Sequence, residues 1–186
     1  MSDRTADPPE PLPTFRYHPD PVATGSIERS DATCAACGRA RGWRYTGLVY
    51  CPDEVDHVCP WCIADGSAAA RLDANFADAG VEVPDDVPRA VLDEVSERTP
   101  GYVAWQTNRW MYHCGDGAAF LGLAGWPELQ AHPGAIDVLL HEHDQYGWSP
   151  EESLEFVEGL GIDHDATAYL FRCQQCGAEL AYSDMS

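Results

Sequence analysis

The chain has 186 residues, 45% of them hydrophobic and 23% charged, and a chain of this size buries roughly two-thirds of its unfolded surface without help from metals or disulfides. Its net charge of −20 repels nucleic-acid phosphate and attracts basic proteins. We therefore expect no direct nucleic-acid contact, and no membrane span, because no apolar run reaches the ~18 residues of a membrane helix. The alternative is that the acidity only reflects the habitat of the organism.

The N-terminal segment predicts an unstructured start. Residues 1–11 are polar and proline-rich, without the apolar core of a signal peptide, so we expect a disordered tail and a cytoplasmic protein whose thiols stay reduced. The prolines of Leu12 to Ser26 favour an extended segment that lies on the module following it. Within this segment we expect His18 to lie at the surface or to cap a neighbouring element.

Cysteine spacing is the strongest signal in the first half of the chain. Two residues between cysteines let a tight turn direct both sulfurs at one ion, and two such turns close a tetrahedral zinc site. Two C-x-x-C pairs stand here with 21 residues between them. We predict that they bind one zinc ion through Cys34, Cys37, Cys59 and Cys62.

Two other uses of thiols stay open in this half. A C-x-x-C pair at a helix start has a lowered thiol pKa, so Cys59 and Cys62 would also suit a redox pair. Cys51 has no pairing partner by spacing, and we expect it to be a free, partly buried thiol.

The residues around these cysteines predict a small zinc module over residues 12–80. Gly42 to Tyr50 is rich in aromatic and β-branched residues and predicts a short strand or hairpin. Ile63 to Phe76 predicts a helix with Cys59 and Cys62 at its entrance. A cysteine turn, a hairpin and a helix in this order predict a treble-clef-like arrangement.

Residues 81–186 predict an α/β region without a clear internal boundary. A helix runs from Pro88 to about Arg98 and stops at Thr99-Pro100-Gly101. The elements predicted after it are a hairpin of Tyr102 to Trp105 and Trp110 to His113, a strand over Ala118 to Leu123, helical regions over Gly125 to Gln130 and Ala135 to His143, and a helix from Ser149 to Leu160 opened by a capping box.

The third C-x-x-C pair, Cys173 and Cys176, lies between two predicted strands, Ala166 to Arg172 and Ala178 to Tyr182. This pattern of two strands joined by a cysteine pair predicts a zinc-ribbon-like hairpin that would supply half of a second zinc site. We predict Cys114 as the third ligand and His113 as the fourth. Adjacent strand residues point to opposite faces, so these two meet at one ion only where the strand breaks into a turn.

Several alternatives to this second site stay open. The carboxylate or imidazole of Asp116, His141 or His143 competes for the fourth position, and the thiols would otherwise simply pack in a core. With the second site included, the predicted fold class is α+β: a mixed small domain with a treble-clef-like zinc module near the N-terminus, a zinc-ribbon-like hairpin at the C-terminus and two zinc ions. The oligomeric state is left open.

The sequence offers little for catalysis. His141-Glu142-His143 has its histidines two residues apart, whereas the zinc-protease motif needs them four apart on one helical face. A zinc ion held by four cysteines has no open position for water. We expect a non-enzymatic protein. The rival classes are a metal-dependent hydrolase at the second site and a thiol-disulfide oxidoreductase using Cys59 and Cys62.

Four stretches between Leu12 and Tyr182 resemble the CbrC family of small bacterial proteins: Leu12 to Ser26, Cys34-Ala-Ala-Cys-Gly38, Cys59-Pro-Trp-Cys-Ile-Ala-Asp-Gly-Ser-Ala68 and His113-Cys-Gly-Asp116. The resemblance implies a link to tolerance of a nuclease-type colicin. Together with the acidity, it suggests an immunity-like protein that binds a basic toxin. Trp105, Trp110 and Trp126 are candidate interface anchors, with burial in the core as the alternative for each.

Overall fold

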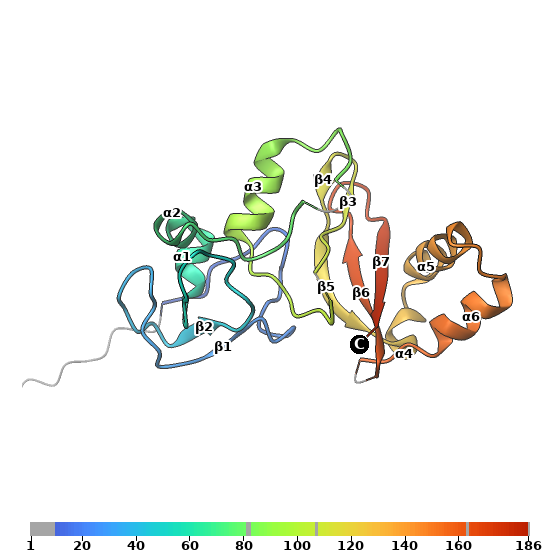
Figure 1. The fold of residues 1–186 in the computed structure, drawn as a ribbon, viewed down its shortest axis with the longest axis horizontal. Helices are drawn as coiled ribbons and strands as arrows, with labels where there is room; N and C mark the ends of the chain where they lie inside the picture. The colour runs from blue at the N-terminus through green and yellow to red at the C-terminus, as the bar shows by residue number, and fades with distance from the viewer. Residues whose placement is uncertain (1–9, 81–82, 107, 163, 186) are drawn as a thin grey trace, which may run out of the picture.

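The computed structural model describes residues 10–80, 83–106, 108–162 and 164–185, and within these ranges it has a mixed α+β fold (Figure 1). No helix in these ranges is long and apolar enough to cross a membrane. The elements in chain order are β1 (Ile27–Arg29), β2 (Trp43–Tyr45), α1 (Pro60–Ala64), α2 (Ser67–Leu72), α3 (Arg89–Arg98), β3 (Tyr112–His113), β4 (Asp116–Gly117), β5 (Ala119–Ala124), α4 (Trp126–Leu129), α5 (Pro133–Gln145), α6 (Pro150–Glu158), β6 (Ala166–Arg172) and β7 (Glu179–Met185).

An antiparallel sheet in the order β5-β6-β7 lies at the centre and is covered on both faces. Side chains alternate along a strand, so Tyr169 and Phe171 of β6 pack into an aromatic cluster on one face. Ala168 and Leu170 face the other way and pack with α5 and α6. Figure 1 shows these two helices with α4 on one side of the sheet and the N-terminal part of the chain on the other.

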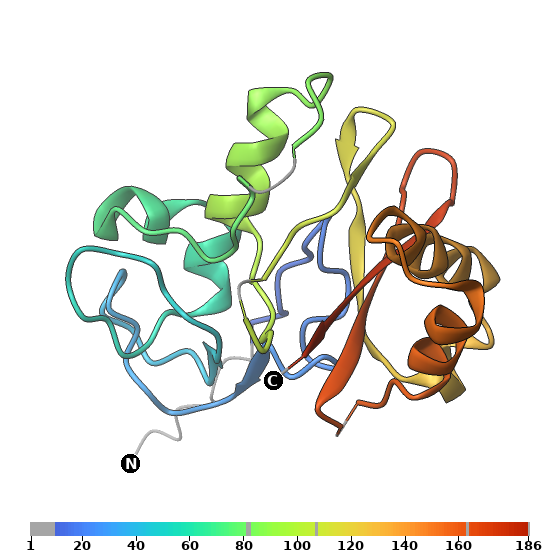
Figure 2. The same cartoon turned by 45° about the vertical axis from the view of Figure 1, so that its right-hand side comes forward.

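The N-terminal part has a hydrophobic cluster of its own, built around β1, β2, α1 and α2. Ile27 pairs with Tyr45 in the short antiparallel β1–β2 ladder, and both side chains are buried. Figure 2 shows this part of the chain beside the central sheet, with α3 above them. The described residues therefore have three hydrophobic clusters: this one and one on each face of the central sheet.

The extended segment before β1 joins the two parts. Phe15 is buried in the N-terminal cluster, whereas Tyr17, two residues later, is buried in the aromatic cluster of the sheet. The carbonyl of Pro11 accepts a hydrogen bond of 3.0 Å from Trp61 Nε1. The prediction that this segment lies on the first module is confirmed, and it also reaches the sheet. The prediction that it is extended throughout is wrong, because residues 21–25 form a turn in which the N–H of Gly25 donates to the Val22 carbonyl at 3.1 Å. The expected tail over 1–11 lies mostly outside the described residues.

Most of the predicted elements after residue 84 are confirmed. The structure has α3, β5, α4, α5, α6, β6 and β7 where helices and strands were expected. The capping box is present: Ser149 Oγ accepts from the backbone N–H of Glu152, whose carboxylate accepts from the N–H of Ser149 at 2.9 Å. Pro133 opens α5 instead of interrupting the helix, because proline suits the first helical turn.

The predicted helix from Ile63 to Phe76 is wrong, because the chain forms two short helices there. Gly66 takes a left-handed conformation with φ of 76° between α1 and α2, and Asp73 does the same with φ of 50° after α2. Both residues end a helical turn, since the left-handed conformation does not continue a right-handed helix. The strand expected over Gly42 to Tyr50 is reduced to β2, which pairs with β1 and not within a hairpin.

The predicted aromatic hairpin between residues 102 and 113 is also wrong. Its described residues form no strand until β3, and Thr107 of the expected turn lies outside the described ranges. Tyr102 instead stacks on Phe120 with ring centroids 4.1 Å apart, and Trp110 is 2% exposed. Tyr102 and Trp110, two of the aromatic residues that suggested strands, therefore pack in the core without forming a strand. Trp105 is exposed, and Trp126, the first residue of α4, is partly buried.

His18 is buried, which contradicts the expected place at the surface. Its Nδ1 lies 2.7 Å from the carbonyl oxygen of Pro100, which only accepts, so Nδ1 carries the proton and donates. Nε2 lies 2.7 Å from Thr24 Oγ1. Loss of solvent lowers the pKa of His18 to about 4.

Candidate metal centres

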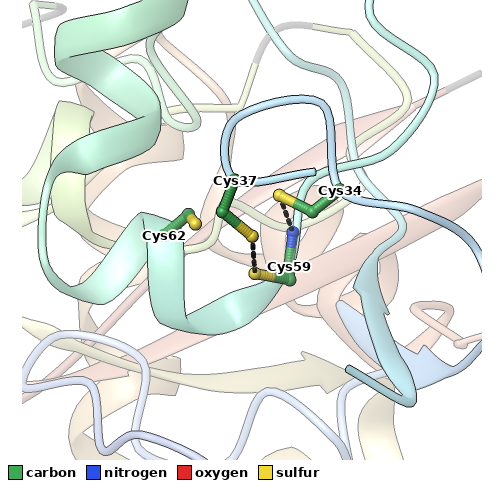
Figure 3. A group of neighbouring side chains, drawn as sticks. All are labelled: Cys34, Cys37, Cys59 and Cys62. Carbon is green, nitrogen blue, oxygen red and sulfur yellow. Dashed lines mark hydrogen bonds between the residues drawn. The ribbon is translucent and has the colours of Figure 1, made fainter. Parts of the chain in front are cut away.

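The structure brings the first two C-x-x-C pairs together (Figure 3). Cys34 and Cys37 lie on a turn after β1, Cys59 is the residue before α1, and Cys62 lies inside α1. The four sulfurs lie within 4.8 Å of one another, with Cys37 Sγ 3.9 Å from Cys59 Sγ. We call this group the first centre.

Local backbone geometry explains how the turn of the first centre forms. The N–H of Gly38 donates to the Cys34 carbonyl at 2.8 Å, and the N–H of Cys34 donates to the Arg39 carbonyl at 3.0 Å. Gly38 has a φ of 68°, a left-handed conformation that glycine adopts without strain. This closed turn holds the two sulfurs of the pair on one side of the backbone.

Hydrogen bonding at the first centre favours a thiolate at Cys34, whereas the pKa values of Cys59 and Cys62 are raised. A hydrogen bond from the Cys59 thiol lowers the pKa of Cys34 to about 4 and raises the pKa of Cys59. The backbone N–H of Cys59 also donates to Cys34 Sγ at 3.3 Å. The guanidinium of Arg41 lies beside Cys59, pairs with Glu10 and stacks 4.2 Å above the Trp61 ring. This partly buried positive charge offsets part of the negative charge of the thiols when they ionise.

The second group unites the two chain segments that the sequence predicted would meet. His113, Cys114, Cys173 and Cys176 offer donor atoms within 4.8 Å of one another. Cys114 Sγ is 3.8 Å from Cys176 Sγ, and His113 Nδ1 is 3.2 Å from the first of these sulfurs and 3.4 Å from the second. We call this group the second centre. Cys114 and Cys176 are exposed, so it lies at the surface, whereas three sulfurs of the first centre are buried.

The strand that carries His113 breaks into a turn at the next residue, as the prediction required. Cys114 has a φ of 54° and Gly115 a φ of 67°, which returns the chain into β4. The Cys173 turn repeats the hydrogen bonds of the first-centre turn: the N–H of Gly177 donates to the Cys173 carbonyl at 3.0 Å, and the N–H of Cys173 donates to the Ala178 carbonyl at 2.8 Å.

The three competitors for the fourth position are engaged elsewhere. The buried carboxylate of Asp116 accepts from Arg16 and, at 2.8 Å, from the Tyr17 hydroxyl. His143 is buried, with Nδ1 2.8 Å from Ser153 Oγ, and His141 pairs with Gln145 on the outside of α5. None of the three belongs to the second centre. The His143 ring also stacks on Trp148, with ring centroids 4.7 Å apart.

Hydrogen bonding at the second centre favours one thiolate. Burial opposes ionisation of Cys173, but the backbone N–H groups of Cys176 and Gln175 outweigh it and lower the pKa of Cys173 to about 6. The hydrogen bond to Cys176 raises the pKa of Cys114 to about 11. The remaining cysteine, Cys51, joins neither centre, and its Sγ lies 2.9 Å from the carbonyl oxygen of Asp53.

Comparison with known proteins places the chain in one family. The model of the family described as "Uncharacterised protein family (UPF0167)" matches residues 12–185. UPF0167 protein Mb2317 of Mycobacterium bovis and UPF0167 protein MT2352 of Mycobacterium tuberculosis are each 51% identical over 179 residues, covering 96% of both chains. UPF0167 protein PA1536 of Pseudomonas aeruginosa is 44% identical over 169 residues, covering 90% of this chain and 93% of its own. No solved structure matches the chain.

These findings overturn the resemblance to the CbrC family, because both the family model and the relatives carry the other family name. Three of the four stretches that carried the resemblance contain cysteines of the two centres, and short cysteine motifs are shared by many unrelated zinc-binding proteins, so they discriminate poorly between families. The nuclease toxin as a partner was inferred from that resemblance, and it loses its support together with it.

Proposed function

The chain belongs to the uncharacterised protein family UPF0167, and we propose that it is a zinc-stabilised, non-enzymatic binding protein with two structural zinc ions. The donor geometry carries this proposal. Tetrahedral zinc with bonds of about 2.3 Å to sulfur places its sulfur ligands about 3.8 Å apart. The sulfur-to-sulfur distances of 3.9 Å in the first centre and 3.8 Å in the second agree with that spacing.

In this proposal the two centres stabilise different parts of the fold. The first is a treble-clef-like module in which the Cys34 turn and the start of α1 share one ion. The second is a zinc-ribbon-like site in which the turn between β6 and β7 is joined to the β3–β4 turn. The matching hydrogen bonds of the turns at Gly38 and Gly177 support the reading of both as zinc knuckles.

Complete ligand sets favour a structural role over a catalytic one. Each centre offers four protein donors, which leaves no coordination position for a water nucleophile. At the second centre the nearby carboxylate of Asp116 is already bonded to Arg16 and Tyr17, so it is not free to act as a base. At the first centre Cys59 shares its surroundings with Cys34 and Cys37, which argues against a separate redox pair with Cys62.

Binding of a basic partner protein is the activity that the charge supports. A surface with a net charge of −20 attracts cationic proteins over several ångströms and repels nucleic acid. The association should weaken as salt screens it.

Metal analysis tests the structural part of the proposal. We expect elemental analysis of the purified chain to give two zinc ions per molecule, and one after either Cys37→Ser or Cys176→Ser. Cys51→Ser is the matched control, because it removes a thiol that lies in neither centre. A metal-free wild type that unfolds at the same temperature with and without chelator would refute the proposal, as would equal zinc loss in the control.

A further inference from the structure

Exposed apolar side chains gather where residues 48–50 meet residues 103–106. Leu48 is 71% exposed, Val103 70%, Trp105 55% and Tyr50 42%. Three of them, Leu48, Tyr50 and Val103, line a narrow cleft together with the more deeply placed Tyr45 and Tyr102. We call it the apolar cleft. Single exposed apolar residues are common, but a contiguous group in a hollow is typical of interaction sites.

A larger hollow of about 640 Å³ adjoins the apolar cleft, and Tyr50 lines both. It lies between α2, α3 and the chain that follows α2. Its lining includes five alanines, whose side chains are small, and four carboxylates against one guanidinium. The guanidinium, Arg89, already pairs with one of the carboxylates, Asp93, at 2.7 Å. The other three carboxylates belong to Asp73, Asp78 and Glu97. We call this hollow the acidic groove.

We propose that the apolar cleft and the acidic groove form one docking surface for a basic segment of a partner protein. An apolar side chain of that segment fills the cleft, and an arginine or lysine of the same segment lies in the groove. This inference rests on the proposed binding function and assigns it a place on the molecule.

The two hollows match the two ends of such a ligand. Arginine and lysine carry long apolar stems with a charged head, so the stem packs on an alanine floor while the head meets the carboxylates at the rim. Aromatic and aliphatic side chains make up the centre of protein interfaces, and the polar residues around them form the rim. Tyr50 stands between the two and contacts both parts of the ligand.

The docking surface is separable from the metal centres. None of the eight candidate metal ligands lines either hollow. Substitutions on the surface should therefore leave zinc content unchanged. Asp73→Asn and Glu97→Gln together remove two charges and keep the size of both side chains, and asparagine tolerates the left-handed conformation of residue 73.

The test is a selection of random phage-displayed peptides on the zinc-loaded full chain, followed by fluorescence anisotropy with the enriched peptides. We expect these peptides to combine arginine or lysine with a large apolar residue. The Asp73→Asn/Glu97→Gln variant should weaken their binding by about 2- to 30-fold, as expected for two partly exposed ion pairs. Leu48→Ala should weaken it by about 10-fold or more through lost apolar contact.

Matched controls come from α6, where Glu155→Gln/Glu158→Gln removes the same charge and Leu154→Ala removes the same apolar atoms from exposed positions. We expect these variants to bind the peptides within 2-fold of wild type, because substitutions outside the docking surface should change the binding affinity very little. Equal weakening in the surface variants and the α6 controls would overturn the docking surface while leaving a diffuse acidic binding function intact. A zinc-loaded wild type that enriches no basic peptide would overturn both.

Discussion

Replacing His18 by asparagine should remove a specific part of the acid sensitivity of this protein. His18 is fully buried, and burial lowers its pKa from 6.5 to about 4. Asp20 raises the pKa by a smaller amount through its charge. Asparagine retains an N–H that can donate to the Pro100 carbonyl and does not titrate in this range.

The sign and the size follow from linkage. Between pH 6.5 and 4 the unfolded chain protonates at residue 18 and the folded chain does not, so the free energy of unfolding falls as the pH falls. With these two pKa values, the loss between pH 7.5 and pH 5 is about 2 kcal/mol, and it levels off near 3 kcal/mol below pH 4.

Urea unfolding followed by tryptophan fluorescence measures this effect at pH 7.5 and pH 5. The Cys173 thiolate, whose pKa is about 6, also becomes protonated on acidification, but the variant carries the same second centre. The comparison therefore isolates residue 18. We expect the His18→Asn variant to start from a lower stability at pH 7.5, because of the smaller side chain, and to lose about 2 kcal/mol less than wild type on acidification. Equal losses in the two proteins would show that the burial of His18 does not set its protonation.

Two further predictions concern the second centre and its surroundings, and a third concerns the start of α6. Asp116→Ala leaves the buried Tyr17 hydroxyl without its acceptor and should cost about 1–3 kcal/mol in urea unfolding, and an unchanged stability would contradict that role. A chelator should extract zinc in two phases with the exposed second centre first, read with a colorimetric zinc indicator, and Cys176→Ser should abolish the fast phase rather than the slow one. Ser149→Ala removes the N-cap of α6 and should lower stability by about 1 kcal/mol, or a melting temperature by about 2–4 °C, whereas an unchanged melting curve would argue against the cap.

Local signals in the sequence were sufficient for the elements that local chemistry determines. The capping box at Ser149 fixes a helix start within four residues, and each C-x-x-C-G turn closes on itself. The meeting of Cys114 with Cys173 and Cys176 was also predictable. The Cys173/Cys176 pair supplies only two of four zinc ligands, and a short predicted strand ends in donor residues at His113 and Cys114.

Long-range contacts account for the elements that were missed. The partner of His18 is a carbonyl 82 residues away, so nothing near the histidine indicated its burial. Tyr102 and Trp110 have the composition of strand residues, but β propensity mainly reflects packing on a half-buried surface, and these rings find that packing without a ladder. The left-handed conformation of Asp73 has no reliable local signal, since aspartate also occurs inside helices.

The two centres differ in when a growing chain can complete them. All donors of the first come from residues 34–62, whereas the second needs residues 113–176. A polypeptide emerging from the ribosome can therefore fold its N-terminal portion around an ion long before β7 exists. A product truncated ahead of Cys173 would lack β7 and would carry one loaded centre and an unpaired β6 edge, the kind of strand edge on which aggregation begins.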